Sequence, residues 1–286
     1  MKRLFVTIDT EMDADIKWHK KWPPEYSSVL EGIPKFYRPL WDRYDVHPIY
    51  FLSPEILYSE ECCAVFKEEV SKGAIIGAHL HPEYIEPDRQ LESAKQNGPA
   101  QFPCYDCSID IEKAKIENLT ELIEDKLGVR PVWYRAARFG ADDDTYSILD
   151  QLGYQYESSV TPGIDWSDRG GVDYSVYSSE AYHIEGTNLT EYPVTIDNKR
   201  WGFIGRLLPN NWLFYKWLRP THMTYCEMKG LIKKYALVGR ELVMMFHSME
   251  IMINKTPYVR NGLMQRYYLW RLDRALKCAH DMGYSL

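Results

Sequence analysis

Short apolar stretches alternate with amphipathic stretches along most of the chain. The apolar stretches are rich in β-branched and aromatic residues, which predicts strands at residues 3–9, in the first part of 45–57, and at 74–81, 129–140, 154–160, 191–196 and 241–247. Apolar residues at helical spacing predict helices at the end of 45–57 and at 61–73, 109–128, 142–153, 226–239 and 265–283. Strands that alternate with helices are typical of parallel β/α units. We therefore predict an α/β fold, a distorted (β/α) barrel of about seven parallel strands.

Two segments interrupt this alternation. Residues 84–108 and 162–226 show little regular periodicity, and loops of this length are often functional. The sequence contains no obvious repeat, low-complexity stretch or linker. We expect a single domain that covers residues 1–286.

Composition narrows the class of protein. The formal net charge is -7 and no basic block is present, so we expect no nucleic-acid partner. The first ten residues contain only a short apolar run, and no run approaches the 18 apolar residues of a membrane span. We therefore expect no membrane span and, by default, a cytoplasmic location. The oligomeric state stays open.

The six cysteines give no clear site. Cys104 and Cys107 form one C-x-x-C, but a structural zinc site of that kind needs a second pair. We expect the cysteines to be reduced and without a functional role, because disulfides are rare in the cytoplasm.

Ionisable side chains stand at the ends of several predicted strands, where barrels of this type place their active sites. The residues in question are Asp9, Glu11, His79, His81, Arg135, Arg138, Asp165, the neighbouring Trp166, and His247. Residues two apart share a strand face, which aligns Asp9 with Glu11 and His79 with His81. Each alone has an ordinary structural explanation, such as a helix cap for Asp9. Five strand ends with ionisable groups are harder to attribute to chance.

One carboxylate and two imidazoles suit zinc, and three protein ligands leave a fourth position open, as in catalytic sites. A metal of this kind lowers the pKa of water and polarises a carbonyl group. A second carboxylate could accept the proton of the water, and a further histidine could protonate the leaving group. The set therefore indicates hydrolysis of an amide or ester.

Five short motifs in a fixed order carry a family resemblance. They are TIDTE (7–11), HLHP (79–82), RAARFG (135–140), SSVTPGIDW (158–166) and MFHS (245–248). From Thr7 to at least Ser248 the chain resembles the polysaccharide deacetylases of carbohydrate esterase family 4, and most of all a bacterial branch linked with O-antigen or surface-polysaccharide synthesis. The resemblance implies a distorted β/α barrel of the polysaccharide-deacetylase type and a divalent metal, with zinc favoured.

In this family Asp9 resembles the general base, and Glu11, His79 and His81 resemble the metal ligands. Two departures stand out. The common pattern has two adjacent aspartates, whereas Thr10 occupies the second place here. The common pattern also separates its histidines by four residues, and here they are two apart. Which of Asp9 and Glu11 binds the metal therefore stays open.

The remaining motif residues follow the same resemblance. Arg135 resembles the arginine that orients the base, and a nearby cation would keep Asp9 ionised. His247 resembles the general acid, with Asp165 expected to pair with it. Trp166 would form a wall of the site, and Arg138 would contact an anionic part of the substrate.

The predicted function is a metal-dependent hydrolase that removes an acetyl or formyl group from the nitrogen of a sugar. A nucleotide-linked or lipid-linked precursor of a surface polysaccharide is the expected substrate. Two alternatives remain. One is a hydrolase with an amidohydrolase-type barrel, and the other is a non-catalytic sugar-binding homologue with a decayed site, which Thr10 suggests.

Overall fold

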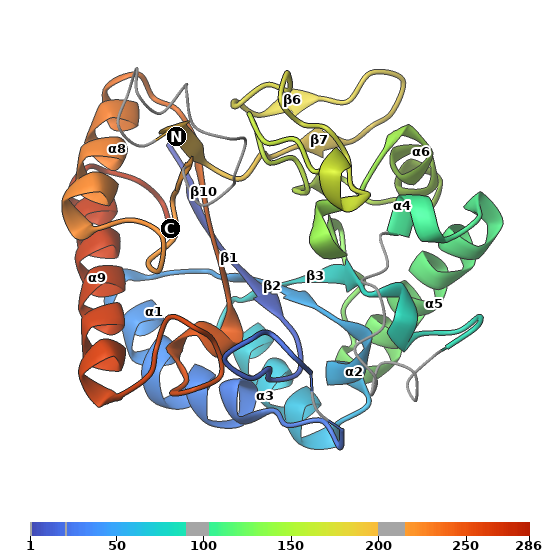
Figure 1. The fold of residues 1–286 in the computed structure, drawn as a ribbon, viewed down its shortest axis with the longest axis horizontal. Helices are drawn as coiled ribbons and strands as arrows, with labels where there is room; N and C mark the ends of the chain where they lie inside the picture. Colours follow the sequence, from blue (N-terminus) through green and yellow to red (C-terminus); the bar gives the residue numbers. More distant parts are fainter. Residues whose placement is uncertain (1, 21, 90–102, 200–214) are drawn as a thin grey trace.

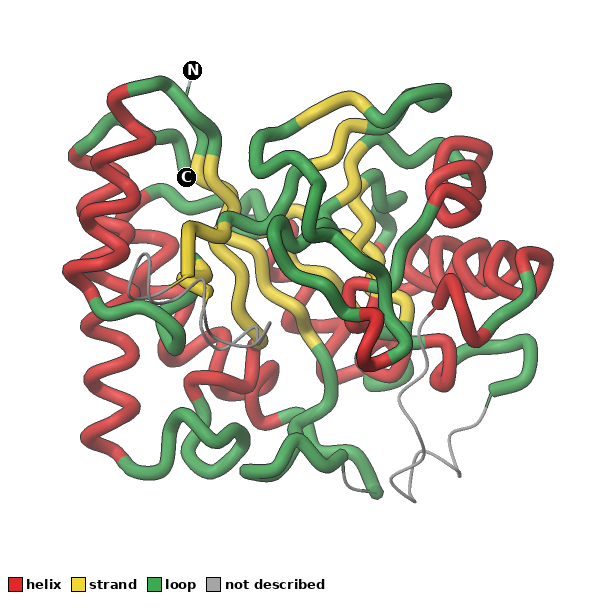
Figure 2. The backbone as a smooth tube through the Cα atoms, turned by 45° about the horizontal axis from the view of Figure 1, so that its top comes forward, coloured by secondary structure: helices red, strands yellow, loops and turns green. Residues whose placement is uncertain are grey.

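The computed structural model describes residues 2–20, 22–89, 103–199 and 215–286 (Figure 1). Its centre is a curled, half-barrel sheet with the strand order β10-β1-β2-β3-β4-β5-β7-β6 (Figure 2). The bounds are β10 (Leu242–His247), β1 (Leu4–Thr10), β2 (Ile49–Leu52), β3 (Ile75–Leu80), β4 (Trp133–Ala136), β5 (Tyr156–Glu157), β7 (Thr190–Glu191) and β6 (Tyr182–His183). A separate antiparallel pair joins β8 (Ile196–Lys199) to β9 (Tyr215–Trp217).

Helices surround the sheet (Figure 1). The longer ones are η1 (Ser28–Tyr37), α1 (Arg38–Tyr44), α3 (Glu60–Ser71), α5 (Ile109–Leu127), α6 (Asp143–Gln151), α8 (Tyr225–Leu237) and α9 (Gly262–Asp281). Short turns of helix are α2 (Pro54–Leu57), η2 (Pro82–Tyr84), α4 (Pro103–Asp106), η4 (Ala137–Phe139), η5 (Ser167–Arg169) and η7 (Ser248–Ile251). None of the helices in the described ranges combines the length and the apolar character needed to cross a membrane.

Burial on both faces explains why the central strands are almost continuously apolar. In β1 all residues except Phe5 are buried, and the same holds for β10 up to His247. Parallel strands covered on both sides read in this way rather than as alternating apolar and polar residues. The register aligns Asp9 of β1 with His247 of β10. Two candidate site residues therefore lie side by side at one sheet end.

The α/β class is confirmed, and so are the predicted helices α3, α5, α6, α8 and α9. Helix α5 ends at Leu127, one residue before Gly128, which has a φ of +72°. Helix α3 stops near Gly73, whose φ is +90° and where a Cβ atom would lie 2.5 Å from Nδ1 of His47. The positive φ favours glycine at this helix end, and a Cβ atom there would also displace the His47 ring.

The prediction of about seven parallel strands is met only in part. All pairings from β10 to β7 are parallel, but β6 pairs antiparallel with β7 at the edge. The predicted strand at 191–196 is divided between β7 and β8, because Pro193 lacks the N–H that a ladder needs. The predicted strand at 154–160 is reduced to Tyr156–Glu157.

Helices η1 and α1 were not predicted. Gly32 and Pro34 lie inside η1, and Pro39 lies at the start of α1, so the local sequence reads as broken. Burial of Val29, Ile33 and other residues in the hydrophobic core overrides that local preference. The segments 84–108 and 162–226 contain α4, η5 and β6 to β9, and parts of both lie outside the described residues.

Candidate metal centre

Three side chains with metal-binding atoms meet at the carboxyl ends of β1 and β3. Glu11 lies one residue beyond β1, His79 belongs to β3, and His81 follows β3 directly. All three are buried, and Oε1 of Glu11 lies 3.5 Å from Nε2 of His79 and 3.2 Å from Nε2 of His81. One ligand atom from each residue falls within 4.8 Å of the others. We call this cluster, Glu11–His79–His81, the candidate metal centre.

The surroundings of both imidazoles fit a bound cation. Nδ1 of His79 lies 2.8 Å from the carbonyl oxygen of Arg135, and Nδ1 of His81 lies 3.5 Å from Oε1 of Glu83. A proton on each Nδ1 leaves both Nε2 lone pairs directed at the cluster, as in metal-binding histidines. Nε2 of His81 is buried and makes no hydrogen bond, because its contact with Glu11 lacks hydrogen-bond geometry. A buried nitrogen without a partner is costly, so these residues fit a divalent cation.

The charges around the cluster keep Glu11 ionised. Burial by itself raises the pKa of Glu11, but Lys20 and then His81 lower it well below its usual range. Burial alone would lower the pKa of His81, but Glu11 and then Glu83 raise it by more. The net result is a pKa of about 9. A cation on Nε2 would displace that proton, so metal binding here should weaken in acid.

Lys20 holds the second oxygen of Glu11. Its Nζ lies 2.5 Å from Oε2 of Glu11 and 2.8 Å from the carbonyl oxygen of Met12. Glu11 therefore presents Oε1 to the two histidines while Oε2 faces the ammonium group. The pairing orients the carboxylate and directs a single oxygen to the cluster.

Asp9 and Arg135 form a buried ion pair beside the candidate metal centre. Nη1 of Arg135 donates to Oδ1 of Asp9 at 2.7 Å and to Oγ1 of Thr7 at 3.0 Å. The guanidinium also donates to the carbonyl oxygen and the hydroxyl of Ser158, each at 2.8 Å. Burial favours the neutral form of Asp9, but Arg135 first, then His79 and His247, hold its pKa below its ordinary value. Asp9 is therefore ionised and fixed in orientation.

His247 approaches the cluster from the end of β10. Its Nε2 lies 3.6 Å from Oε1 of Glu11. Its Nδ1 accepts from the backbone N–H of Glu250 and lies 3.2 Å from a guanidinium nitrogen of Arg219, itself 2.5 Å from Oε1 of Glu250. Two donors at Nδ1 place the ring proton on Nε2, which faces the cluster.

This arrangement corrects the predicted partner of His247. Asp165 accepts from the backbone N–H of Ser167 at 2.8 Å, and hydrogen bonds from the side chain and the backbone of Ser167 lower its pKa. In the described residues Arg219 and Glu250 occupy the Nδ1 side of His247 instead. Glu250 is fully buried, and although burial opposes its ionisation, Arg219 and His247 hold its pKa well below the ordinary value.

Arg138 and Trp166 belong to the segments that follow β4 and β5. Arg138 donates to Oε1 of Glu83 at 2.7 Å, which connects it to His81. Arg138 and Phe139 both have positive φ, of 56° and 60°, a strained backbone that is typical of functional sites. Trp166 stacks on Phe139 with ring centroids 6.2 Å apart and donates its indole N–H to Thr161.

The neighbours that sequence reasoning missed come mostly from loops. Lys20 lies in the loop after β1, and Arg219 follows β9, where no periodic pattern marked either residue. Trp18, with a φ of 65°, packs its ring 5.2 Å from that of His247. Of these residues, Glu250 could have been identified from the sequence, because it stands three residues after His247, which is the spacing of a capping box.

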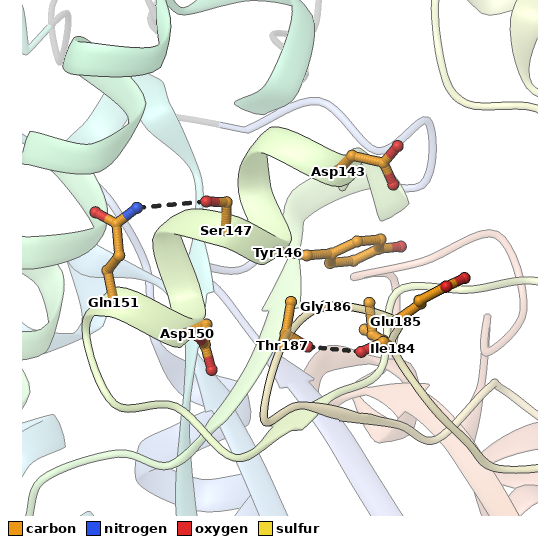
Figure 3. Close-up of a pocket in the computed structure, with 9 residues that line it drawn as sticks. All are labelled: Asp143, Tyr146, Ser147, Asp150, Gln151, Ile184, Glu185, Gly186 and Thr187. Atoms are coloured by element: carbon orange, nitrogen blue, oxygen red, sulfur yellow. Dashed lines mark hydrogen bonds between the residues drawn. The ribbon is translucent and has the colours of Figure 1, made fainter.

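A cavity of about 620 Å³ lies elsewhere, between α6 and the turn at residues 184–187 (Figure 3). None of the predicted site residues lines it. Its walls include Asp143, Asp150 and Glu185 but no lysine or arginine, so it does not suit an anionic sugar. The strand ends therefore remain the candidate site.

Known structures share this fold. A candidate polysaccharide deacetylase from Mycobacterium smegmatis is 16% identical, with a TM-score of 0.54, over 99% of this chain and 86% of that one. A GH57-type branching enzyme from Pyrococcus horikoshii is 11% identical, with a TM-score of 0.53, over 99% of this chain and 68% of that one. Searches of family models and of curated proteins found no match. The fold is thus one that the candidate deacetylase and the branching enzyme share.

Proposed function

We propose that the chain is a metal-dependent hydrolase that removes an N-acyl group from a sugar. One observation carries the proposal: the candidate metal centre is joined through His79 to the backbone of Arg135, which forms the ion pair with Asp9, and through Glu11 to His247, whose facing nitrogen has the proton. Metal ligands, a proton acceptor and a proton donor thus converge from β1, β3, β4 and β10. This is the set that hydrolysis of an amide requires.

The chain's own residues divide the work. A divalent cation, when bound, supplies Lewis acidity that lowers the pKa of water and polarises the acyl carbonyl. Asp9 accepts a proton from the attacking water, and Arg135 keeps the Asp9 carboxylate ionised and aimed. His247 donates its Nε2 proton to the nitrogen as the C–N bond breaks, and the proton that Asp9 took from the water then returns to Nε2 of His247. Water and an N-acyl sugar thus yield a free amine and acetic or formic acid, which releases its proton to solvent, and both side chains return to their starting forms.

The finer assignments rest on the motif resemblance. Zinc fits one carboxylate and two imidazoles, and a nucleotide- or lipid-linked precursor of a surface polysaccharide fits the motifs. In this proposal residues 1–286 act as one catalytic domain. Glu11, His79 and His81 are the metal ligands, Asp9 is the base, and His247 is the acid.

A substrate screen with metal analysis tests the proposal. Zinc-loaded protein is incubated with N-acetylated and N-formylated amino sugars, both free and nucleotide-linked, and released acetate and formate are measured. We expect release that stops on chelation and returns with added zinc. The His79→Ala variant should lose both metal and activity. Hydrolysis that persists in metal-free protein would refute the proposal.

A further inference from the structure

The outer surface of α8 and α9 mixes exposed apolar side chains with cations. The two helices contact each other and run side by side along one side of the molecule (Figure 1). We call this surface the α8–α9 face and define it by Leu237, Leu263, Tyr267, Trp270, Lys229, Lys233, Arg266 and Arg274.

Helical spacing places the apolar members of α9 in one stripe. Leu263, Tyr267, Trp270 and Arg274 follow at intervals of four, three and four residues. Leu263 is 77% exposed, Tyr267 is 48% exposed and Trp270 is 43% exposed. The Tyr267 and Trp270 rings stack at 5.8 Å, and Trp270 also meets Tyr225 of α8 at 5.4 Å. A continuous aromatic surface therefore bridges the two helices.

The charge of this face opposes that of the whole protein. Helices α8 and α9 contain seven basic and three acidic residues, whereas the full chain has a net charge of -7. Both acids of α9 are already paired, one with Arg43 and one with Lys277. In the described ranges four exposed cations of the face lack a carboxylate partner, namely Lys229, Lys233, Arg266 and Arg274.

We propose that the α8–α9 face docks on the surface of a bilayer that contains anionic lipids. Tryptophan and tyrosine rings insert at the boundary between headgroups and acyl chains, and unpaired Lys and Arg attract anionic headgroups. Lysine is depleted from protein–protein interfaces, which makes Lys229 and Lys233 poor support for a protein partner. The acidic remainder of the chain is repelled by the same bilayer, so only this face is presented.

The face is joined to the candidate active site. Helix α9 begins directly after the loop that contains Tyr258, and the Tyr258 ring lies 5.9 Å from that of Trp18. Trp18 in turn packs against His247. Docking would therefore hold the acid–base site near the membrane surface. Combined with the proposed function, on which this step rests, the docking favours a lipid-linked sugar over a nucleotide-linked one.

Vesicle binding by the full chain tests the docking. Vesicles of phosphatidylcholine, with or without phosphatidylglycerol, are sedimented with the protein at low and high salt. We expect binding only to the anionic vesicles, with loss of binding at high salt. Each cation near the surface contributes roughly fivefold, so Arg266→Gln with Arg274→Gln should weaken binding roughly 25-fold. Trp270→Ser should also weaken it.

Matched controls locate the effect. Lys67→Gln with Lys72→Gln removes two exposed cations in and just after α3, and Val176→Ser removes an apolar side chain that is 89% exposed. Both should bind like the unmodified protein. Equal losses in control and face variants, or equal binding to neutral vesicles, would overturn the docking. A dimer in light scattering that the Trp270→Ser variant abolishes would assign the face to a second copy and also overturn it.

Activity separates the docking from the proposed function. Face variants should hydrolyse a soluble N-acyl sugar at an unchanged rate and a vesicle-borne one more slowly. Vesicle binding without any hydrolysis would refute the proposed function and leave the docking intact. Equal slowing on both substrates would refute the link between docking and substrate choice.

Discussion

Replacing Arg135 with methionine should destabilise the protein in a way that depends on pH. Arg135 is fully buried, and its guanidinium makes four hydrogen bonds, to Thr7, Asp9 and twice to Ser158. Methionine retains much of the side-chain volume but leaves Asp9 buried without a counterion. Removing one partner of a buried ion pair typically costs about 3–5 kcal/mol.

The dependence on pH follows from the direction of the Asp9 shift. In the native protein the pKa of Asp9 lies below its ordinary value, so its contribution to stability is present above the unfolded-state pKa of about 3.9 and is lost as pH falls through the folded pKa. Without Arg135, burial dominates and raises the pKa of Asp9 in the variant. The variant should therefore gain relative stability as acid protonates Asp9.

Urea unfolding of metal-free protein at several pH values measures this effect. We expect a gap in unfolding free energy between Arg135→Met and the native chain of about 3–5 kcal/mol at neutral pH. The gap should narrow at pH 3, toward the roughly 1–2 kcal/mol that the lost hydrogen bonds alone cost. Arg135→Lys retains a positive charge, so its unfolding free energy at neutral pH should lie between those of Arg135→Met and the native chain. A gap that is the same at both pH values would show that the Arg135–Asp9 charge pair is not what matters.

Three further predictions concern the candidate site. His79→Ala should abolish zinc binding in elemental analysis, whereas Cys104→Ser should retain it; the reverse would move the metal to the cysteines. Asp9→Asn should retain the metal and lose activity by a factor on the order of 10²–10⁴, while Glu11→Gln should weaken metal binding itself; metal lost only in the Asp9 variant would exchange their roles. Glu250→Gln should leave the metal content unchanged but lower the melting temperature, because Arg219 loses its buried carboxylate partner; an unchanged melting temperature would contradict that reasoning.

Local patterns were enough to predict most elements. Residues 109–128 and 142–153 are helices in the structure because their apolar spacing and their caps agree, with Asp142 capping α6. The antiparallel edge strand β6 depends on pairing with distant residues, which periodicity does not report. Helix η1 contains Pro34 and depends on its buried contacts.

The same distinction applies to the site. Asp9, Glu11, His79 and His81 could be predicted to lie together because parallel strands end at one edge and alternate residues share a face. Arg219 and Lys20 could not, because their positions depend on the course of long loops. An isolated β-bridge pairs Lys20 with Ala14, for example, and this turn of the loop brings the Lys20 ammonium group to Glu11. The prediction that Asp165 pairs with His247 was wrong for the same reason, because Arg219, which lies beside Nδ1 of His247, follows a long loop.

The fold alone does not decide the chemistry, because a branching enzyme shares it at a similar TM-score. Cleavage of a glycosidic bond by the usual route needs two carboxyl groups, one of them protonated through a raised pKa. Asp9 and Glu11 are the two acids that the end of β1 brings to the candidate site, and Arg135 and Lys20 hold the pKa of both below the ordinary value. Neither can act as the acid of a glycosidase near neutral pH. Two imidazoles that present Nε2 to an ionised glutamate suit a metal instead, and that contrast is what favours amide hydrolysis here.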